Sequence, residues 1–290
     1  MSLSAIKTEN LTHIYSENTP FEKKAIENVN IEIEKGEIVG IIGHTGSGKS
    51  TLIQHFNGLL KPTSGKILIN DVDIWQSSVN IRDIRFKVGL VFQYPEYQLF
   101  EETVFKDIAF GPKNMGLSDS EIKERVYEAA NFVGLNEEVL SKSPFELSGG
   151  QKRRVAIAGV IAMRPEILIL DEPTAGLDPR GREMILNQIG EYHKSTGGTV
   201  LIVSHSMEDI ARFTNKALVL KNSGIFMYDT IDNVFSHSQE LTQIGLNIPQ
   251  ITKVFIGLRA KGFDVDSNIY TVENAKNEIL SKLLKRRTLK

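Results

Sequence analysis

Nine consecutive residues have the types and the spacing of a phosphate-binding loop. They are Gly43, His44, Thr45, Gly46, Ser47, Gly48, Lys49, Ser50 and Thr51, which fit the pattern of a glycine, four variable residues and then Gly-Lys-Ser/Thr. The glycines let successive backbone N–H groups turn toward phosphate oxygens, Lys49 can reach the β- and γ-phosphates, and the Ser50 hydroxyl can ligate Mg²⁺. The pattern predicts a nucleotide site, because a chance match somewhere in a chain of this length is expected in only about 1% of cases.

The segments on either side are those that such a loop requires. Residues 38–42 form an apolar run that predicts a buried strand, and residues 51–60 carry apolar side chains at helical spacing. A helix that begins at the loop adds free N–H groups and the positive end of its dipole. The order strand, loop, helix therefore strengthens the prediction.

Three more apolar runs predict buried strands that end in polar residues. Residues 88–92 are followed by Gln93, residues 167–170 by Asp171 and Glu172, and residues 199–203 by Ser204 and His205. In a parallel sheet, ligands sit at the carboxyl ends of the strands. We therefore expect these polar side chains to face the same nucleotide.

Their chemistry suits a nucleotide and its metal ion. Asp171 is placed to hold Mg²⁺, and Glu172 beside it could polarise a water for attack on the γ-phosphate. Gln93 could meet the metal ion or the water, His205 could donate to the γ-phosphate, and Tyr15 could stack on an adenine face. The alternatives are a surface loop for Gln93, a helix cap for the two carboxylates, a structural histidine and a packing tyrosine.

A second candidate anion site lies further along the chain. Leu147, Ser148, Gly149, Gly150 and Gln151 precede a helix predicted over residues 152–163. Two glycines before a helix start can form a nest of N–H groups. Lys152, Arg153 and Arg154 add positive charge to the first turn of this helix. The helix dipole disfavours cations at this N-terminal end, so the helix is expected to face an anion.

Composition gives no sign of nucleic-acid binding or of a membrane span. The 290 residues are 41% hydrophobic and 24% charged, with a net charge of -2. There is no cysteine, which excludes disulfides, thiolate zinc sites and cysteine nucleophiles. The apolar runs are far shorter than the ~20 residues of a membrane helix, and the first residues do not resemble a signal peptide. We expect a soluble protein that reaches a membrane only through a partner or a surface.

The chain is expected to divide near residue 235. Residues up to about 35 predict short strands, and residues 94–162 predict a mainly helical segment. After residue 235 the alternation of loop, strand and helix stops. Residues 1–235 are therefore interpreted as one nucleotide-binding domain, and residues 236–290 as a small α+β extension.

Together these motifs resemble the ATP-binding cassette (ABC) family over about residues 4–235. The run Leu147–Gln151 is similar to the family signature, and the other motifs occur in the family's order. The resemblance implies an α/β, P-loop NTPase core with an antiparallel β subdomain and a helical subdomain over about residues 94–162. It also implies that two cassettes pair head to tail, with ATP between the phosphate loop of one and the signature of the other.

The resemblance further implies a role for each candidate residue. Residues 43–51 hold the phosphates and Tyr15 stacks on adenine. Ser50, Asp171 and Gln93 contact Mg²⁺, Glu172 is the general base and His205 stabilises the γ-phosphate. Residues 147–151, Ser148 and Gly150 above all, act on the nucleotide of the partner chain.

A narrower resemblance is to the ATPases of energy-coupling factor transporters. It rests on residues 93–100, 110–112 and 154–160. It implies a second cassette subunit, an integral transmembrane coupling component, a substrate-binding membrane component, and a place at the cytoplasmic face of the membrane. The substrates would be vitamins or cobalt and nickel ions, and the extension would help dimerisation. The loop after Tyr15 is longer than usual, and Ala175-Gly176 replaces the commoner Ser-Ala.

Two other functions would also use a nucleotide site. A soluble ABC ATPase of translation or DNA repair usually carries two cassettes or a coiled-coil insertion, and this chain shows one cassette and no heptad tract. A regulatory nucleotide sensor would lack the base or the signature, and both Glu172 and Leu147–Gln151 are present. Nucleic acid is therefore not expected as a partner.

Overall fold

A six-stranded sheet positions the phosphate loop at its centre. The computed structural model describes residues 3–266 and 268–288. The strand order is β10-β9-β3-β8-β7-β6, in which only the edge strand β10 is antiparallel to its neighbour. The strands are β3 (Ile38–Gly43), β6 (Val88–Val91), β7 (Ile167–Asp171), β8 (Thr199–Val203), β9 (Lys216–Lys221) and β10 (Gly224–Thr230).

The inner strands are buried on both faces, which explains their continuous apolar sequences. Every residue of β3, β6, β7 and β8 is buried. Leu168 and Leu170 of β7 point into a core shared with the helices, whereas Ile167 and Ile169 point into a core shared with the second sheet. Parallel strands covered on both sides need no polar face, so period-two alternation disappears. The predicted buried strands are confirmed.

The second sheet is antiparallel and has the order β2-β1-β4-β5. Its strands are β1 (Ser4–Tyr15), β2 (Lys23–Glu34), β4 (Ser64–Ile69) and β5 (Val72–Asp73). We expected short strands here, but β1 and β2 have 12 residues each. Asn10 and Asn28 adopt positive φ angles, and the register between β1 and β2 shifts beside Asn10. Such irregularities break the alternation and make one long strand look like several short ones.

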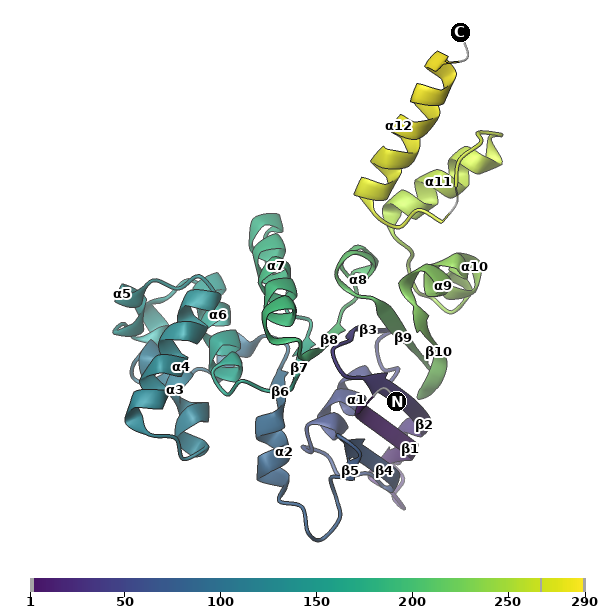
Figure 1. The fold of residues 1–290 in the computed structure, drawn as a ribbon. Coiled ribbons are helices and arrows are strands. Elements are labelled where there is room, and N and C mark those ends of the chain that lie inside the picture. The colour runs from purple at the N-terminus through teal and green to yellow at the C-terminus, as the bar shows by residue number, and fades with distance from the viewer. Residues whose placement is uncertain (1–2, 267, 289–290) are drawn as a thin grey trace.

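Helices occupy three regions around the sheets (Figure 1). The helix α1 (Lys49–Phe56) follows the phosphate loop, and α2 (Ile81–Lys87) precedes β6. The helices α3 (Val104–Asn114), α4 (Asp119–Phe132), α5 (Glu137–Leu140) and α6 (Gly149–Ile161) gather beyond the β6 edge. The helices α7 (Pro179–Thr196), α8 (Met207–Phe213) and α9 (Ile231–Ser236) pack on the six-stranded sheet. In the described part of the chain, no helix is both long and apolar enough to cross a bilayer.

The C-terminal extension is helical. It contains α10 (Ser238–Gln243), α11 (Gln250–Ala260) and α12 (Val272–Thr288), and the last two project from the rest of the molecule (Figure 1). Phe255, Ile269 and Ala275 form a small core of their own between these helices. We expected strands as well, but residues 236–266 and 268–288 contain none. Phe255 of α11 and Ala275 of α12 are buried in this core, whereas other apolar residues of the two helices remain exposed.

His55 on α1 is a histidine whose protonation would oppose folding. Its side chain is fully buried, Nδ1 lies 2.7 Å from the Thr51 carbonyl oxygen, and Nε2 has no hydrogen-bond partner. Burial, the largest cause, lowers the pKa of His55 from 6.5 to about 4. Between these values the unfolded chain binds the proton and the folded chain does not. The stability that depends on neutral His55 is therefore present above pH 6.5 and is lost as the pH falls toward 4.

We expect the free energy of unfolding to fall by about 2 kcal/mol through this residue between roughly pH 7.5 and pH 5. Urea unfolding of the wild type and of His55→Gln at both pH values measures the effect. The difference between the two pH values should shrink in His55→Gln and stay unchanged in His237→Gln, which alters a half-buried histidine at the start of the extension. An equal loss of stability in the wild type and in His55→Gln would contradict the assignment.

Candidate functional site

The phosphate loop connects the end of β3 to the start of α1. Gly48 caps α1 with a left-handed backbone, φ 102°, and a Cβ there would lie 2.4 Å from the Ala25 carbonyl oxygen. No side chain fits that position. Glycine is therefore required both because β2 lies so close and because the φ angle is positive. The helix starts at Lys49, two residues earlier than predicted, with its first N–H groups turned toward the loop.

Lys49 is held inside the loop by main-chain carbonyls. Its Nζ donates to the carbonyl oxygens of Gly43 at 2.7 Å and His44 at 3.1 Å, and the side chain is buried. Burial is the largest influence and lowers the pKa of Lys49, while Glu172 and Asp171 act in the opposite direction. The ammonium group is therefore fixed at the centre of the loop, beside two carboxylates.

Ser50 and Asp171 join the phosphate loop to the end of β7. The Ser50 hydroxyl donates to Asp171 Oδ2 at 3.2 Å. Burial raises the pKa of Asp171, and the Ser50 hydrogen bond and Lys49 partly offset that rise. The described residues contain no group of three His, Cys, Asp or Glu side chains arranged to hold a metal ion. This pair of oxygens fits Mg²⁺, which is usually bound by one or two protein oxygens together with substrate phosphates.

Glu172 is a buried carboxylate on a strained backbone. Its φ angle is 49°, in the left-handed region, and its N–H donates to the Val203 carbonyl oxygen of β8 at 3.0 Å. Burial, the largest cause, raises the pKa of Glu172 to about 7. Non-glycine residues in this conformation persist where surrounding structure enforces them, and they cluster at functional sites. A carboxylate that titrates near neutral pH is suited to proton transfer.

His205 faces this carboxylate from the end of β8. Its Nε2 lies 3.3 Å from Glu172 Oε1, but the two atoms make no hydrogen bond, since Oε1 has no partner. Burial and then the charge of Lys49 lower the pKa of His205. The imidazole is therefore a neutral group at neutral pH. One ring N–H remains available to a ligand in the cavity.

A cavity of about 250 Å³ brings these side chains together. Its lining comes from the ends of several strands and from the phosphate loop: Tyr15, Lys23, Ala25, Thr45, Gly46, Gly48, Lys49, Ser50, Thr51, Gln93, Asp171, Glu172 and His205. Three predicted residues of the phosphate loop, Gly43, His44 and Ser47, do not line the cavity. The shared location predicted for Gln93, Asp171, Glu172 and His205 from their strand ends is what the structure shows.

Tyr15 lies at the open side of this cavity. It is partly exposed, its hydroxyl is 3.3 Å from the Thr51 hydroxyl, and its ring makes a T-shaped contact with the ring of His13, with centroids 4.6 Å apart. A ring fixed on two sides and open on a third can receive a flat base.

The segment Leu147–Gln151 lies outside this cavity. Ser148 caps α6 in a capping box: its Oγ accepts from the Gln151 N–H at 3.3 Å, and Gln151 Oε1 accepts from the Ser148 N–H at 3.1 Å. The helix begins at Gly149, three residues before the predicted start, so the glycines form its first turn and not a separate nest. The pattern Ser-x-x-Gln indicates this start in the sequence. Leu147 is buried, whereas Gly149 and Gly150 are exposed.

The three cations after this segment do not form one anion-facing group. Arg153 is buried and pairs with Glu96, at 2.8 Å between Nη2 and Oε1. Lys152 lies over the Phe145 ring, and Arg154 reaches the Gly134 carbonyl oxygen at 3.4 Å. Arg153 therefore adds no charge to an anion site at the start of α6, because its guanidinium is engaged inside the chain. Its spacing from Ile157 and Ile161, four and eight residues on, already places it on the buried face of the helix.

Asp209 and Arg182 are functional candidates that sequence reasoning missed. The Arg182 Nε donates to both Asp209 oxygens at 3.0 Å, and the Thr174 hydroxyl donates to Asp209 Oδ2 at 3.4 Å. Thr174 follows Glu172, and Asp209 follows His205. The pair therefore connects the two loops that carry these residues. The sequence signal was the pattern Ser206-x-x-Asp209, a helix start beside His205.

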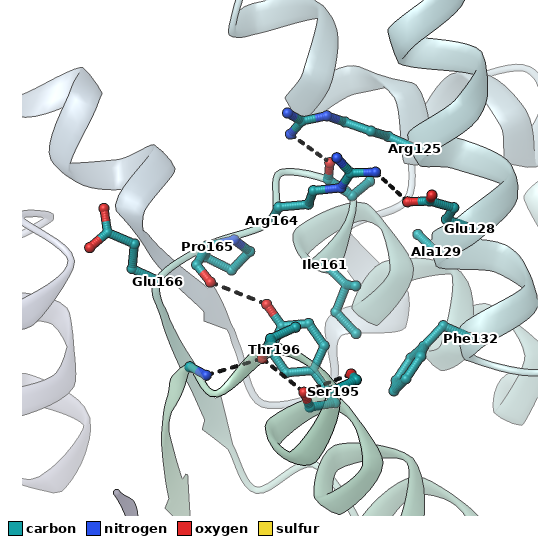
Figure 2. Close-up of a pocket in the computed structure, with 13 residues that line it drawn as sticks. Arg125, Glu128, Ala129, Phe132, Ile161, Arg164, Pro165, Glu166, Ser195 and Thr196 are labelled. Carbon is teal, nitrogen blue, oxygen red and sulfur yellow. Dashed lines mark hydrogen bonds and ion pairs between the residues drawn. The ribbon is translucent and has the colours of Figure 1, made fainter. Parts of the chain in front are cut away.

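A second cavity, of about 370 Å³, lies between α4, α6 and α7 (Figure 2). Its apolar wall includes Ala129, Phe132 and Ile161. The cations at its rim are engaged, because Arg125 donates to the Met163 carbonyl oxygen at 3.1 Å and Arg164 pairs with Glu128 (Figure 2). None of the predicted site residues lines it. The cavity at the strand ends is therefore the candidate functional site.

A parallel sheet with a phosphate loop, two strand-end carboxylates and a separate signature helix defines a nucleotide-hydrolysing cassette. The chain belongs to the family described as ABC transporter, which matches residues 26–175. Its full-length relatives include the energy-coupling factor transporter ATP-binding proteins EcfA2 of Clostridium tetani and Clostridium acetobutylicum. The first is 58% identical over 95% of this chain and 96% of the relative, and the second 60% identical over 96% and 98%.

Solved structures agree with this assignment. The structure of cbiO1 from Clostridium perfringens, described as part of the ABC transporter complex cbiONQ, has a TM-score of 0.73 and 39% identity over 86% of this chain and 97% of that one. The ATP-binding cassette MJ0796, in a dimeric structure bound to ADP and Pi, has a TM-score of 0.70 and 30% identity over 78% and 98%. The chain is thus an ATP-binding and ATP-hydrolysing transporter subunit.

Proposed function

We propose that this chain is the motor subunit of an energy-coupling factor transporter, in which ATP hydrolysis drives uptake of a vitamin or a transition-metal ion through a membrane partner. The observation that carries the proposal is the cavity at the strand ends. It places a phosphate loop, a metal-binding oxygen pair and a buried carboxylate with a raised pKa around one space. The relatives' names supply the transporter class.

Within that cavity, ATP would be held at both ends. The N–H groups of residues 43–51 and the Lys49 ammonium bind the phosphates, and Tyr15 stacks on the adenine. Ser50 and Asp171 would hold Mg²⁺, with Gln93 as a further contact to the metal ion or to a water. When bound, Mg²⁺ neutralises charge on the β- and γ-phosphates.

Glu172 is the general base in this proposal. Its Oε1 has no hydrogen-bond partner and lies in the cavity wall, so it can accept a proton from an attacking water. His205, neutral and 3.3 Å away, donates a ring N–H to the γ-phosphate. The charge that develops on the γ-phosphate is then met by Lys49 and His205 on two sides.

A complete site needs a second cassette. Residues 147–151 lie outside the lining of the ATP cavity, and Ser148, Gly150 and Gln151 line a separate groove together with Asp178 and Arg180. The first N–H groups of α6 are exposed there and can bind the γ-phosphate of the other chain's ATP. The partner is either a second copy or a related ATPase. The cassette would span residues 1–235, with its helical subdomain at about 94–162.

The extension at residues 236–290 would help to hold the pair together. Apolar side chains remain exposed on both projecting helices, among them Val254 and Ile256 of α11 and Ile279 and Leu280 of α12. Exposed apolar residues grouped on adjacent helices are typical of protein interfaces.

The membrane partner would bind near the end of β6. We define the aromatic surface as Tyr94, Tyr97, Phe100 and Phe110. Tyr97 is 84% exposed and Phe100 is 60% exposed, and the Phe100 and Phe110 rings meet edge to face. Exposed aromatic side chains are enriched at protein interfaces. An integral coupling component docked there, together with its substrate-binding membrane component, would hold the chain at the cytoplasmic face of the membrane.

Capture of a tagged chain from detergent-solubilised membranes of its own host tests the proposal. We expect an integral membrane protein and a cassette ATPase to co-purify, and ATP hydrolysis by that complex to drive substrate uptake after reconstitution in vesicles. Co-purification with nucleic acid or ribosomes, without a membrane protein, would favour the soluble ABC ATPase instead.

Removing the aromatic surface should release the membrane partner without affecting nucleotide binding. We expect Tyr97→Ser combined with Phe100→Ser to lower recovery of the membrane protein at least about tenfold, since buried aromatic side chains often dominate interface energy. ATP affinity should stay the same. Phe21→Ser removes an equally exposed aromatic residue elsewhere and should retain the partner. Equal recovery with all three chains would place the docking surface elsewhere.

A further inference from the structure

Arg153 of α6 is a buried cation with every guanidinium nitrogen engaged. Its side chain is 3% exposed. Nε donates to Glu96 Oε2 at 3.0 Å and Nη2 to Glu96 Oε1 at 2.8 Å, which makes the pair bidentate. Nη1 donates to the carbonyl oxygens of Ala175 at 2.5 Å and Pro173 at 3.3 Å. Only arginine has a planar fork that can satisfy acceptors on two sides at once.

The acceptors belong to segments that carry the chemistry of the site. Glu96 lies in the 3₁₀ turn η1 (Pro95–Gln98), which follows Gln93 and presents Tyr97 on the aromatic surface. Pro173 directly follows Glu172. Arg153 itself lies one turn into α6, the helix capped by Ser148. One side chain therefore connects the aromatic surface, the loop that carries Glu172 and the helix α6 that carries the signature.

Simple packing is the alternative explanation, and two arguments weigh against it. A buried ion pair contributes little net stability compared with apolar residues of similar size, so a core position does not call for one. The pair also coincides with backbone strain, because Tyr94 before η1 has a φ angle of 55° and its ring lies 5.9 Å from the Arg153 guanidinium carbon. Strain that is maintained by a specific contact is typical of segments that change conformation.

We propose that Arg153 is a positioning residue that transmits binding at the aromatic surface to Glu172 and to the signature helix. This inference rests on the proposed function. A shift of η1 on docking would move Glu96, and the guanidinium would carry the shift to the carbonyls of Pro173 and Ala175. Glu172 would move with them, and so would the α6 N-terminus that faces the partner's ATP.

The test uses the transporter complex assembled with its membrane partner and reconstituted in vesicles. Arg153→Met, Glu96→Gln and the double variant are compared for ATP affinity, ATP turnover and substrate transported per ATP hydrolysed. We expect transport per ATP to fall about tenfold in each single variant with ATP affinity nearly unchanged, and the double variant to be no worse than either single one, as for residues that act as one unit. Arg164→Met is the matched control, since it breaks an exposed arginine–glutamate pair on the same group of helices.

The outcomes separate a coupling role from a structural one. If the Arg153 and Glu96 variants lose thermal stability and ATP affinity together but transport the same amount per ATP, Arg153 is only structural and the inference is overturned. If Arg153→Met does not fold, Arg153→Lys is used, which keeps the charge but not the fork and should still lower transport per ATP. A wild-type complex that neither hydrolyses ATP nor transports would instead contradict the proposed function.

Discussion

Replacing Glu172 with glutamine is expected to lower ATP turnover by about 10²–10⁴-fold, the range lost when a positioned general base is removed. Glutamine keeps the size of the side chain and its place in the cavity, but it cannot accept a proton from water. The burial that raises the pKa of Glu172 to about 7 makes the ionised form a stronger base than an exposed carboxylate. ATP affinity should be retained, because the phosphate loop and Tyr15 are untouched.

The measurement is ATP turnover per chain, made over a range of protein concentrations. Glu166→Gln is the matched control. Glu166 directly precedes β7, at the opposite end of the strand from Glu172 and far from the cavity, and its Oε2 accepts a hydrogen bond from the Asn70 side chain at 2.8 Å. It should keep wild-type turnover. A Glu172→Gln chain as active as the wild type would exclude Glu172 as the base. A wild type that binds ATP but stays inactive at every concentration would indicate a different cassette as its partner.

Replacing Gly150 with aspartate is expected to lower turnover of the assembled ATPase by about 10²-fold while leaving the fold intact, since misplacing the charge around a transferred phosphoryl group costs catalysis of that order. Gly150 is exposed, and a Cβ there would meet no atom within 4 Å. No contact within this chain requires glycine at this position, although glycine is less favourable than alanine in a helix by up to about 1 kcal/mol. Aspartate is even favoured in a first helical turn.

In the proposed pair of cassettes, the partner's ATP would occupy the space beside Gly150. Gly190→Asp in α7 is the control, because a Cβ there also meets nothing. It should leave turnover unchanged, and both variants should bind ATP as the wild type does. Wild-type turnover in Gly150→Asp would mean that the signature does not face a nucleotide. Recovery of turnover on mixing Gly150→Asp with Lys49→Ala chains would show that two copies of this chain form the sites.

The sequence predicted those features whose physics is local. The phosphate loop follows from glycines and a lysine at fixed spacing, and the buried strands follow from continuous apolar runs. Because carboxyl ends of parallel strands meet at one edge, Gln93, Asp171, Glu172 and His205 could be placed together without any knowledge of the strand order.

Features that depend on distant residues could not be predicted in this way. Arg153 was grouped with Lys152 and Arg154 as a cation of the first helical turn, because its partner Glu96 is 57 residues away in the sequence. The length of β1 was hidden by a register shift beside Asn10, and the start of α6 by two glycines that usually mark a loop. Asp209 was missed because its partner Arg182 comes from another helix.

Tyr15 and the phosphate loop come from different sheets. Tyr15 is the last residue of β1 in the antiparallel sheet, whereas the phosphate loop follows β3 in the six-stranded sheet. A contact of 3.3 Å between the Tyr15 and Thr51 hydroxyls links the two. The base of a nucleotide and its phosphates would thus be recognised by separate structural units. Preference among adenine, guanine and other bases can therefore change through substitutions around Tyr15 and His13, while the hydrolytic machinery remains as it is.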